Sequence, residues 1–386
     1  NGLEKRPKLR FPGFDEPWSI YKAEELFKNV ADKNHPMETV LTIIQGKGTL
    51  PREQAGRNIH YDDASLANYK KVEQGDFIIH LRSFEGGLEM ANEDGIVSPA
   101  YTILRCMKPH SSLFYEAYFH TDEFINHILS KSVEGIRDGR QISYEAFKWL
   151  GLPYCDLSEQ ERIAQLFCTL SHRIEKQQQM VDALKKYKRG VVAAIFSHQL
   201  KFSDATGNPY PEWTSCTLQD AVDFLDGQRK PLESADRAKR QGQYPYYGAS
   251  GIIDYIDDFI FDEPLLLLGE DGANILNRST PLCFIAEGKY WVNNHAHVMR
   301  PKAGQNIKFL CELLESLDYT RYNTGTAQPK LNQDKCRRIG LALPVYEEQC
   351  HIADFLSAFD QRTDKAQSIL DYLLSNRDGL LQQLFI

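Results

Sequence analysis

The chain has 386 residues, of which 42% are hydrophobic and 25% are charged. This length exceeds one ordinary hydrophobic core and predicts two or three folding units, while the composition excludes a disordered or fibrous protein. The formal net charge of −8 argues against a protein that grips nucleic acid alone through phosphate neutralisation, although Lys and Arg cluster locally.

Nothing in the chain indicates export or membrane insertion. The opening NGLEKRPKLRFPGF carries charges and proline where a signal peptide needs an apolar stretch, and we find no run of about 18 apolar residues. The eight cysteines are scattered without CxxC pairs, which is typical of reduced thiols. We therefore expect a cytoplasmic protein that contacts no membrane.

The first part of the chain, residues 1–152, reads as a mixed α/β domain. A basic opening leads through Arg10-Phe11 and Trp18 into short apolar runs that are separated by Gly, Asn and Asp. The runs at 76–81 and 100–106 predict strands. Periodicity gives no strand order, so the sheet topology stays open.

A long helix is predicted over 159–196, within a spacer segment at 153–200. The Leu-Pro dipeptide at 152–153 and the acidic Glu-Gln start suit a helix N-terminus. Apolar residues then recur at three- and four-residue spacing, as in the a/d seam of a coiled coil. The seam includes Ile163, Phe167, Leu170 and Leu184.

The second half of the chain repeats this plan. Lys201-Phe202 with Trp213 resembles the first opening, and residues 201–343 predict a second mixed α/β domain with strands at 264–268, 281–286 and 339–343. A second spacer at 344–386 contains a helix predicted over 348–385. Its seam includes Ile352, Leu356, Leu373 and Leu380.

The two helices are copies of one another, because a shift of 189 residues aligns them without a gap. Identities include Glu159/Glu348, Gln160/Gln349 and Gly190/Gly379. The second domain joins the end of the first helix to the start of the second, so the helices should run antiparallel. We predict an α+β fold in which two mixed α/β domains are separated by two long antiparallel coiled-coil helices, with a pseudo-twofold circular repeat and neighbouring termini.

Lys188 and Arg377 interrupt the seam at equivalent positions. One interpretation is a buried or snorkelling cation that fixes the helix register, and the other is a frayed edge of the seam. The predicted helices do not depend on the choice.

Several stretches resemble the specificity subunits of type I restriction-modification systems, and the likeness extends over nearly the whole chain. YPYYGASGIIDYIDDFIFDEPLLLLGEDGAN at 244–274 and GKYWVNNHAHVMRP at 288–301 are similar to one large group of target recognition domains. The first domain resembles a different group through Gly75-Asp76-Phe77 and GIVSPAYTIL at 95–104. The Glu-Gln and Ile-Ala helix starts resemble the spacers of the family.

The resemblance implies a non-catalytic subunit that reads a bipartite, asymmetric site in double-stranded DNA, one half with each domain. It also implies two methyltransferase subunits docked along the helices and separate restriction/translocase subunits. S-adenosylmethionine, ATP and Mg are then expected on those partner subunits, with no cofactor or metal on this chain.

Base reading in the major groove needs Arg or Lys for guanine and Asn or Gln for adenine, whereas positioning contacts go to phosphate. Polar residues flanking the apolar runs are therefore the candidate DNA-binding residues. In the second domain these are Gln228, Arg229, Lys230, Lys239, Arg240, Tyr247, Ser250 and Asn274, and in the first domain they are Arg52, Arg57, Arg82 and Ser83.

Three other patterns in the sequence suggest different functions. Asn293, Asn294, His295 and His297 indicate a loop-holding network rather than a metal site, because no third ligand has suitable spacing. Asp271 followed by Glu287-Gly288-Lys289 would suit a metal-dependent nuclease. A coiled-coil scaffold that never touches DNA would suit the acidic net charge.

Overall fold

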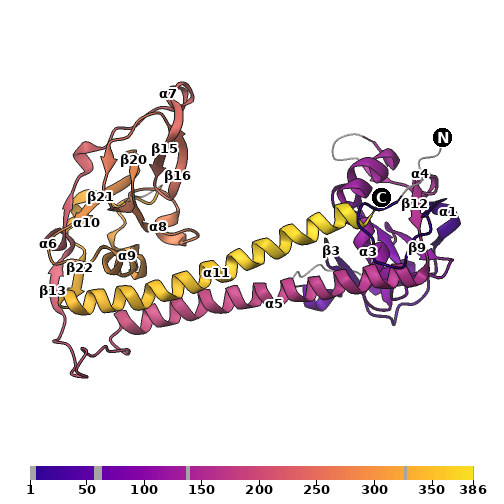
Figure 1. Ribbon diagram of the computed structural model, residues 1–386, viewed down its shortest axis with the longest axis horizontal. Coiled ribbons are helices and arrows are strands. Elements are labelled where there is room, and N and C mark those ends of the chain that lie inside the picture. Colours follow the sequence, from indigo (N-terminus) through magenta and orange to yellow (C-terminus); the bar gives the residue numbers. More distant parts are fainter. Residues whose placement is uncertain (1–5, 56–62, 136–139, 326–327, 386) are drawn as a thin grey trace. The chain divides into compact units, whose positions relative to one another are not determined.

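The computed structural model describes residues 6–55, 63–135, 140–325 and 328–385, and Figure 1 traces the chain. The contacts divide the chain into two compact units, residues 1–179 with 367–386 and residues 180–366. Each unit contains one globular domain and a part of both long helices, α5 (Leu157–Phe196) and α11 (Tyr346–Leu384).

The domain of the first unit is built on a four-stranded antiparallel sheet in the order β2-β9-β6-β7. Strands β1 and β12 pair separately, so that the chain enters and leaves the domain side by side. The elements are β1 (Ser19–Lys22), α1 (Ala23–Leu26), β2 (Phe27–Val30), β3 (Leu41–Ile44), β4 (Gly48–Pro51), β5 (Lys70–Val72), β6 (Phe77–Ile79), α2 (Ser83–Gly86), β7 (Glu89–Met90), β8 (Gly95–Val97), β9 (Thr102–Cys106), α3 (Ser112–Phe119), β10 (Val133–Glu134), β11 (Gln141–Ile142), α4 (Tyr144–Phe147) and β12 (Gly151–Tyr154).

The second unit repeats this topology with a sheet in the order β14-β21-β18-β19 and a β13–β22 pair, and it adds a second sheet in the order β16-β15-β20-β17. The elements are β13 (Thr214–Thr217), α6 (Leu218–Ala221), β14 (Val222–Phe224), α7 (Ser234–Lys239), β15 (Gln241–Gly248), β16 (Gly251–Ile256), β17 (Phe261–Asp262), β18 (Leu265–Gly269), α8 (Asn274–Asn277), β19 (Cys283–Ala286), β20 (Lys289–Val292), β21 (Ala296–Pro301), α9 (Ile307–Ser316), α10 (Gln333–Arg337) and β22 (Gly340–Leu343).

The sequence predictions of the fold are confirmed. The five predicted strand runs contain β6, β9, β19 and β22 and all but the last residue of β18, and the two long helices begin within two residues of their predicted starts. The common topology of the two domains is new information, because the sequence gave no strand order for either.

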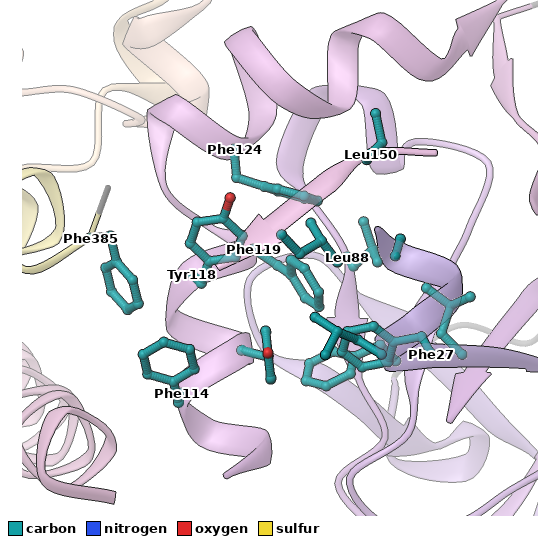
Figure 2. Close-up of a cluster of buried hydrophobic side chains, with 14 of the residues drawn as sticks. Phe27, Leu88, Phe114, Tyr118, Phe119, Phe124, Leu150 and Phe385 are labelled. Atoms are coloured by element: carbon teal, nitrogen blue, oxygen red, sulfur yellow. The ribbon is translucent and has the colours of Figure 1, made fainter. Parts of the chain in front are cut away.

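An aromatic core joins α11 to the domain of the first unit. Phe385, just beyond the end of α11, lies 5.2 Å from Phe114 and 6.0 Å from Phe167 of α5, measured between ring centroids. Figure 2 shows Phe385 beside Phe114 and Tyr118, with Phe119, Leu88 and Phe27 further to the right, away from Phe385. Burial of such rings contributes on the order of 2 kcal/mol each.

The two helices run antiparallel in each unit. In the first unit Phe167, near the start of α5, stacks on Phe385. In the second unit Ile195, near the end of α5, shares a core with Ile352 near the start of α11. The predicted seam faces inward: Ile163, Phe167, Ile352, Leu356 and Leu373 are buried, and Leu170, Leu184 and Leu380 are partly buried.

The circular repeat is visible in the main chain. The amide of Leu9 donates to the carbonyl of Gln383 at 2.9 Å, and the amide of Leu200 donates to the carbonyl of Ala194 at the same distance. Gln383 and Ala194 are equivalent positions of the repeat. The opening of the described chain therefore covers the end of α11 in the way that the second opening covers the end of α5. The first and last described segments lie side by side, as the circular repeat predicts.

The two seam cations differ in their partners. Lys188 Nζ lies 2.5 Å from Glu312 Oε1 and 2.7 Å from Asp360 Oδ1. Burial lowers the pKa of Lys188, but the hydrogen bonds to Asp360 and Glu312 outweigh it and raise the pKa. Arg377 instead pairs with its exposed neighbour Asp378 at 2.9 Å. Lys188 thus bridges α5, α9 and α11, whereas Arg377 lies at the edge of the seam.

Candidate nucleic-acid interface

Five connecting segments of the second domain converge at one end of its sheets. The pairing of Gly269 with Ala296 brings the loop after β18 beside the loop before β21. The segment at 328–331 joins them, since Gly272 donates to Pro329 and Leu331 donates to Glu270 through their amides. We call residues 226–230, 249–250, 270–274, 293–295 and 328–331 the loop edge.

The turn after β15 belongs to the loop edge because of a close backbone approach. A side chain at Gly269 would meet the Ala249 carbonyl oxygen at 2.7 Å, so only glycine fits there. The amide of Asn293 also donates to the carbonyl of Tyr247, which places the β20–β21 loop beside this turn.

A buried polar network holds the loop edge in place. His297 is fully buried, and its Nδ1 lies 2.7 Å from Asp226 Oδ2 while its Nε2 lies 2.7 Å from the Leu331 carbonyl. Burial would raise the pKa of Asp226, but the hydrogen bond and charge of His297, the Val298 amide and the charge of Arg229 lower it. The carboxylate is therefore held charged inside the domain.

Arg229 belongs to this network and not to the exposed surface. Its side chain is 13% exposed, lies 2.8 Å from Glu270 Oε2, and donates to the carbonyl of Ala296 at 2.7 Å. The histidine and asparagine cluster is also part of the network, because Asn293 and His297 are buried and the Asn293 side chain accepts the amide of His295. This agrees with the loop-holding interpretation.

Other groups of the loop edge remain accessible. Lys330 is 48% exposed and pairs with Glu270 at 3.3 Å, and His295 is 50% exposed and pairs with Asp271 at 2.9 Å. Gln228, Lys230 and Ser250 are exposed on neighbouring segments. Rigid scaffolding beneath exposed donors and acceptors is what base reading and phosphate positioning require.

The structure gives Tyr247 and Asn274 supporting contacts. The Tyr247 ring lies 5.6 Å from the Tyr290 ring and is partly buried. The Asn274 side chain accepts the amide of Thr280 at 2.9 Å and donates to its carbonyl at 3.0 Å, which closes the loop after α8.

Lys239 and Arg240 lie apart from the loop edge. They precede β15, whose eight residues separate them from Ser250 by roughly 25 Å at the usual rise of a strand. Arg240 lies 2.9 Å from Asp257 and 5.1 Å from the Trp291 ring centroid, and Lys239 is exposed beside Asp236. The candidates of the second domain therefore form two groups and not one surface.

The first domain has an equivalent edge. Arg82 and Ser83 follow β6, as Asp271 and Asn274 follow the equivalent strand β18. The Arg82 side chain is 73% exposed, whereas Ser83 is buried and accepts the amide of His80. Arg52 lies over the Tyr69 ring, and Arg57 falls outside the described residues.

Sequence reasoning missed several basic residues of these edges. Lys330 and His295 of the second domain were not nominated for DNA binding, and neither were Lys70 and Arg140 of the first. Burial and the nearby charge of Lys33 lower the pKa of Lys70, whose Nζ donates to the Tyr101 carbonyl. Arg140 lies 4.4 Å from the Phe84 ring centroid. Lys330 and Arg140 lie just before α10 and α4, which are equivalent helices of the repeat. This shared position is the sequence signal by which both residues could have been nominated.

The nuclease pattern is not assembled. Leu265 pairs with Ala286 across β18 and β19, so Glu287 lies beyond one end of β18 and Asp271 beyond the other. Five strand residues separate the two ends by at least about 13 Å, too far for a shared metal. Within the described ranges there is no group of three or more His, Cys, Asp or Glu that could hold a metal ion.

Part of the chain is similar to a known protein family. Residues 210–373 match the family described as type I restriction modification DNA specificity domain. This stretch is similar to the type I specificity domain. The loop edge lies within the matched residues of this specificity domain, and so do Lys239 and Arg240.

Two curated relatives match about the same share of the chain. A Haemophilus influenzae protein named as type I restriction enzyme specificity subunit S.HindORF215P is 32% identical over 155 residues, which are 40% of this chain and 38% of the relative. The Escherichia coli type I restriction enzyme EcoprrI specificity subunit is 28% identical over 154 residues, which are 40% of this chain and 37% of the relative. The chain thus spans less than two fifths of the length of these relatives.

The fold of the whole chain is that of type I S subunits. The S subunit of a type I restriction-modification system from M. genitalium superposes with a TM-score of 0.62 at 16% identity and covers 99% of both chains. A structure from work on complex assembly of the type I system gives a TM-score of 0.56 at 14% identity, covering 98% of this chain and 99% of the other. No helix of the described part of the chain is long and apolar enough to cross a membrane.

Proposed function

We propose that this protein reads a bipartite, asymmetric site in double-stranded DNA, one half with each domain, as the specificity subunit of a type I restriction-modification complex. The observation that carries the proposal is the loop edge, a set of exposed polar groups on a buried ionic scaffold inside the specificity domain. The equivalent edge of the first domain, with Arg82 exposed, supports a second reader.

The two edges offer different chemistry. The second domain presents Lys330, His295 and Ser250, and the first presents Arg82 with Arg140 and Lys70 nearby. Different donors read different bases, so the two half-sites should differ in sequence. The long helices would fix the spacer between them.

In this proposal the chain itself is non-catalytic. Two methyltransferase subunits dock along α5 and α11, and restriction/translocase subunits join them. S-adenosylmethionine, ATP and Mg are bound by those partners, and the adenine is flipped into the methyltransferase. The net charge of −8 fits a reader that shares the DNA clamp with basic partner subunits.

The test is to co-express the chain with the methyltransferase subunit from the same locus and to map methylated adenines on a plasmid by single-molecule sequencing. We expect methylation at one two-part motif of constant spacing, absent when the methyltransferase is expressed alone. Unchanged methylation with both proteins folded would overturn the proposal in favour of a scaffold. Lys330→Ala should alter one half of the motif or weaken its use, and Arg82→Ala should affect the other half.

A further inference from the structure

Two adjacent isoleucines are exposed near the tip of the β15–β16 hairpin, just after the turn at 249–250 that belongs to the loop edge (Figure 1). Ile252 is 45% exposed and Ile253 is 54% exposed. Single exposed apolar residues are ordinary on protein surfaces, so exposure by itself indicates no function. The position of Ile253 relative to the loop edge is the informative feature.

Ile253 lies against the loop edge. A Cβ added to Gly248 would meet Cγ2 of Ile253 at 3.1 Å and Nδ2 of Asn293 at 3.6 Å, so the isoleucine covers this glycine beside the β20–β21 loop. Asn293 is itself buried and accepts the amide of His295. The exposed part of Ile253 therefore forms an apolar spot beside the polar groups of the loop edge.

A β-bulge gives Ile253 this position. Tyr247 pairs with Ile252 and Tyr246 pairs with Asp254, so Ile253 is an additional residue of β16 that falls between two pairs of the ladder. Bulges redirect side chains and are frequent beside functional sites. β16 is also an edge strand of its four-stranded sheet, which leaves the bulge accessible from outside.

Ile252 belongs to the other face of the hairpin. It lies opposite Tyr247, whose ring packs 5.6 Å from the ring of Tyr290. Neighbouring residues of a strand point to opposite faces, so Tyr247 and Gly248 face opposite ways. Ile252 on the Tyr247 face and Ile253 on the Gly248 face are thus similar in exposure but different in surroundings.

The charges around Ile253 are compatible with DNA. The adjacent carboxylate of Asp254 lies 3.1 Å from Arg237, which compensates its negative charge. Lys230 and Lys330 of the loop edge are exposed and can contact phosphate. An apolar side chain among polar donors complements thymine, which presents a C5 methyl group in the major groove.

We propose that Ile253 recognises a thymine in the half-site read by the second domain, through apolar contact with the C5 methyl group of the base. This proposal rests on the proposed function, which brings DNA to the loop edge, and it adds one base and one side chain to that function. The polar groups of the loop edge position the duplex, and Ile253 distinguishes thymine from cytosine, whose C5 carries only hydrogen.

The test removes the methyl group without changing base pairing. The full-length chain is assembled with the methyltransferase subunit from the same locus, and duplexes carrying the mapped motif are prepared with each thymine in turn replaced by deoxyuridine. Fluorescence anisotropy gives the dissociation constants of the wild type, of Ile253→Ala and of the matched control Ile252→Ala. Circular dichroism reports the folding of each variant, and native mass spectrometry reports its subunit composition.

We expect deoxyuridine at one position of one half-site to weaken wild-type binding about three- to fivefold, as for the loss of one buried methyl group. Ile253→Ala should weaken binding to the unmodified duplex by at least that factor and should no longer respond to deoxyuridine at that position. Ile252→Ala should respond as the wild type does, and so should Ile253→Val, which keeps a branched apolar end.

A folded Ile253→Ala complex that still responds to deoxyuridine, or a wild type that responds at no position, would overturn the proposal and leave the proposed function standing. Fewer methyltransferase copies on Ile253→Ala would also overturn it, because the side chain would then contact protein and not DNA. Absence of any two-part motif would instead overturn the proposed function, and the assignment of Ile253 with it.

Discussion

Glu159 and Glu348 occupy the same position of the repeat, but within the described ranges only Glu159 has a guanidinium partner. Arg10 binds Glu159 through two hydrogen bonds of 2.6 and 2.8 Å, and Trp18 donates to the same carboxylate at 3.0 Å. The second opening has Lys201 in place of Arg10, and Lys201 is exposed beside Glu212. Glu348 is buried, and its Oε2 has no hydrogen-bond partner among the described residues.

Loss of charge at the two glutamates should therefore have unequal effects. Glu159→Gln leaves the Arg10 guanidinium without its counterion and should lower the free energy of unfolding by about 2 to 4 kcal/mol. Glu348→Gln removes a poorly compensated buried carboxylate and should change it by less than about 1 kcal/mol or raise it. Urea denaturation of both variants measures the difference, and equal losses would contradict this account.

The raised pKa of Glu348 should make part of the free energy of unfolding depend on pH. Burial raises the pKa of this carboxyl despite the hydrogen bond from Trp213. A raised pKa means that the folded chain holds the proton more tightly than the unfolded chain, so the contribution of Glu348 to stability declines as pH rises through its folded pKa. Denaturation at pH 4 to 8 should show Glu348→Gln gaining on the wild type toward pH 8. A constant difference would exclude this cause.

The seam cations provide another matched pair. Lys188→Met leaves the carboxylates of Glu312 and Asp360 without their shared ammonium and should cost about 1 to 3 kcal/mol. Arg377→Met breaks an exposed contact between adjacent residues and should stay within about 0.5 kcal/mol. Thermal melts of the two variants measure these losses of stability. A larger loss of stability for Arg377→Met than for Lys188→Met would contradict the bridging role of Lys188.

Substitutions of two adjacent residues of the loop edge, Arg229 and Lys230, should distinguish a side chain that holds the loops in place from one that contacts DNA. Arg229→Met removes the more buried of the two cationic partners of Glu270 and should cost about 2 to 4 kcal/mol of stability. Lys230→Met removes an exposed charge and should leave stability within about 0.5 kcal/mol while weakening DNA binding and lowering its salt slope by about one. Fluorescence anisotropy of the assembled complex at several salt concentrations measures the second effect. An unchanged slope would remove Lys230 from the interface.

Gly190 and Gly379 are identical positions of the two helices at which an added Cβ would meet nothing within 4 Å. Glycine inside a helix costs roughly 0.5 to 1 kcal/mol relative to alanine. Gly190→Ala and Gly379→Ala should each stabilise the chain by that amount, seen as a raised Tm. Lower stability would reveal a constraint on the free chain, whereas weaker subunit assembly at higher Tm would indicate a backbone approached closely by a partner.

The long helices were predictable because their pattern is local and repeated. The heptad spacing, the acidic first turn and the internal repeat each indicate a helix over the same residues. The strands were also recognisable from local composition, as for β18 with its run of buried leucines. Their order was not, because β2 pairs with β9 across Phe27 and Cys106, residues far apart in the chain.

The candidate site was less predictable, since charge alone does not reveal partners. Arg229 has the chemistry of a guanine reader, but Glu270, 41 residues later, holds it inside the domain. Arg240 and Ser250 are close in sequence, yet a whole strand separates them. Exposure depends on such long-range pairs, and only the folded chain displays them.

Each globular domain is closed by a short pair of antiparallel strands, which we call its clasp. Ser19 lies opposite Tyr154 in one clasp, and Thr214 lies opposite Leu343 in the other. The two ends of a domain are thus already held together, so replacing what lies between them adds no large loop-closure cost. The residues between two paired strands can therefore be exchanged for another sequence while β1 with β12, or β13 with β22, keeps the joint to the long helices unchanged.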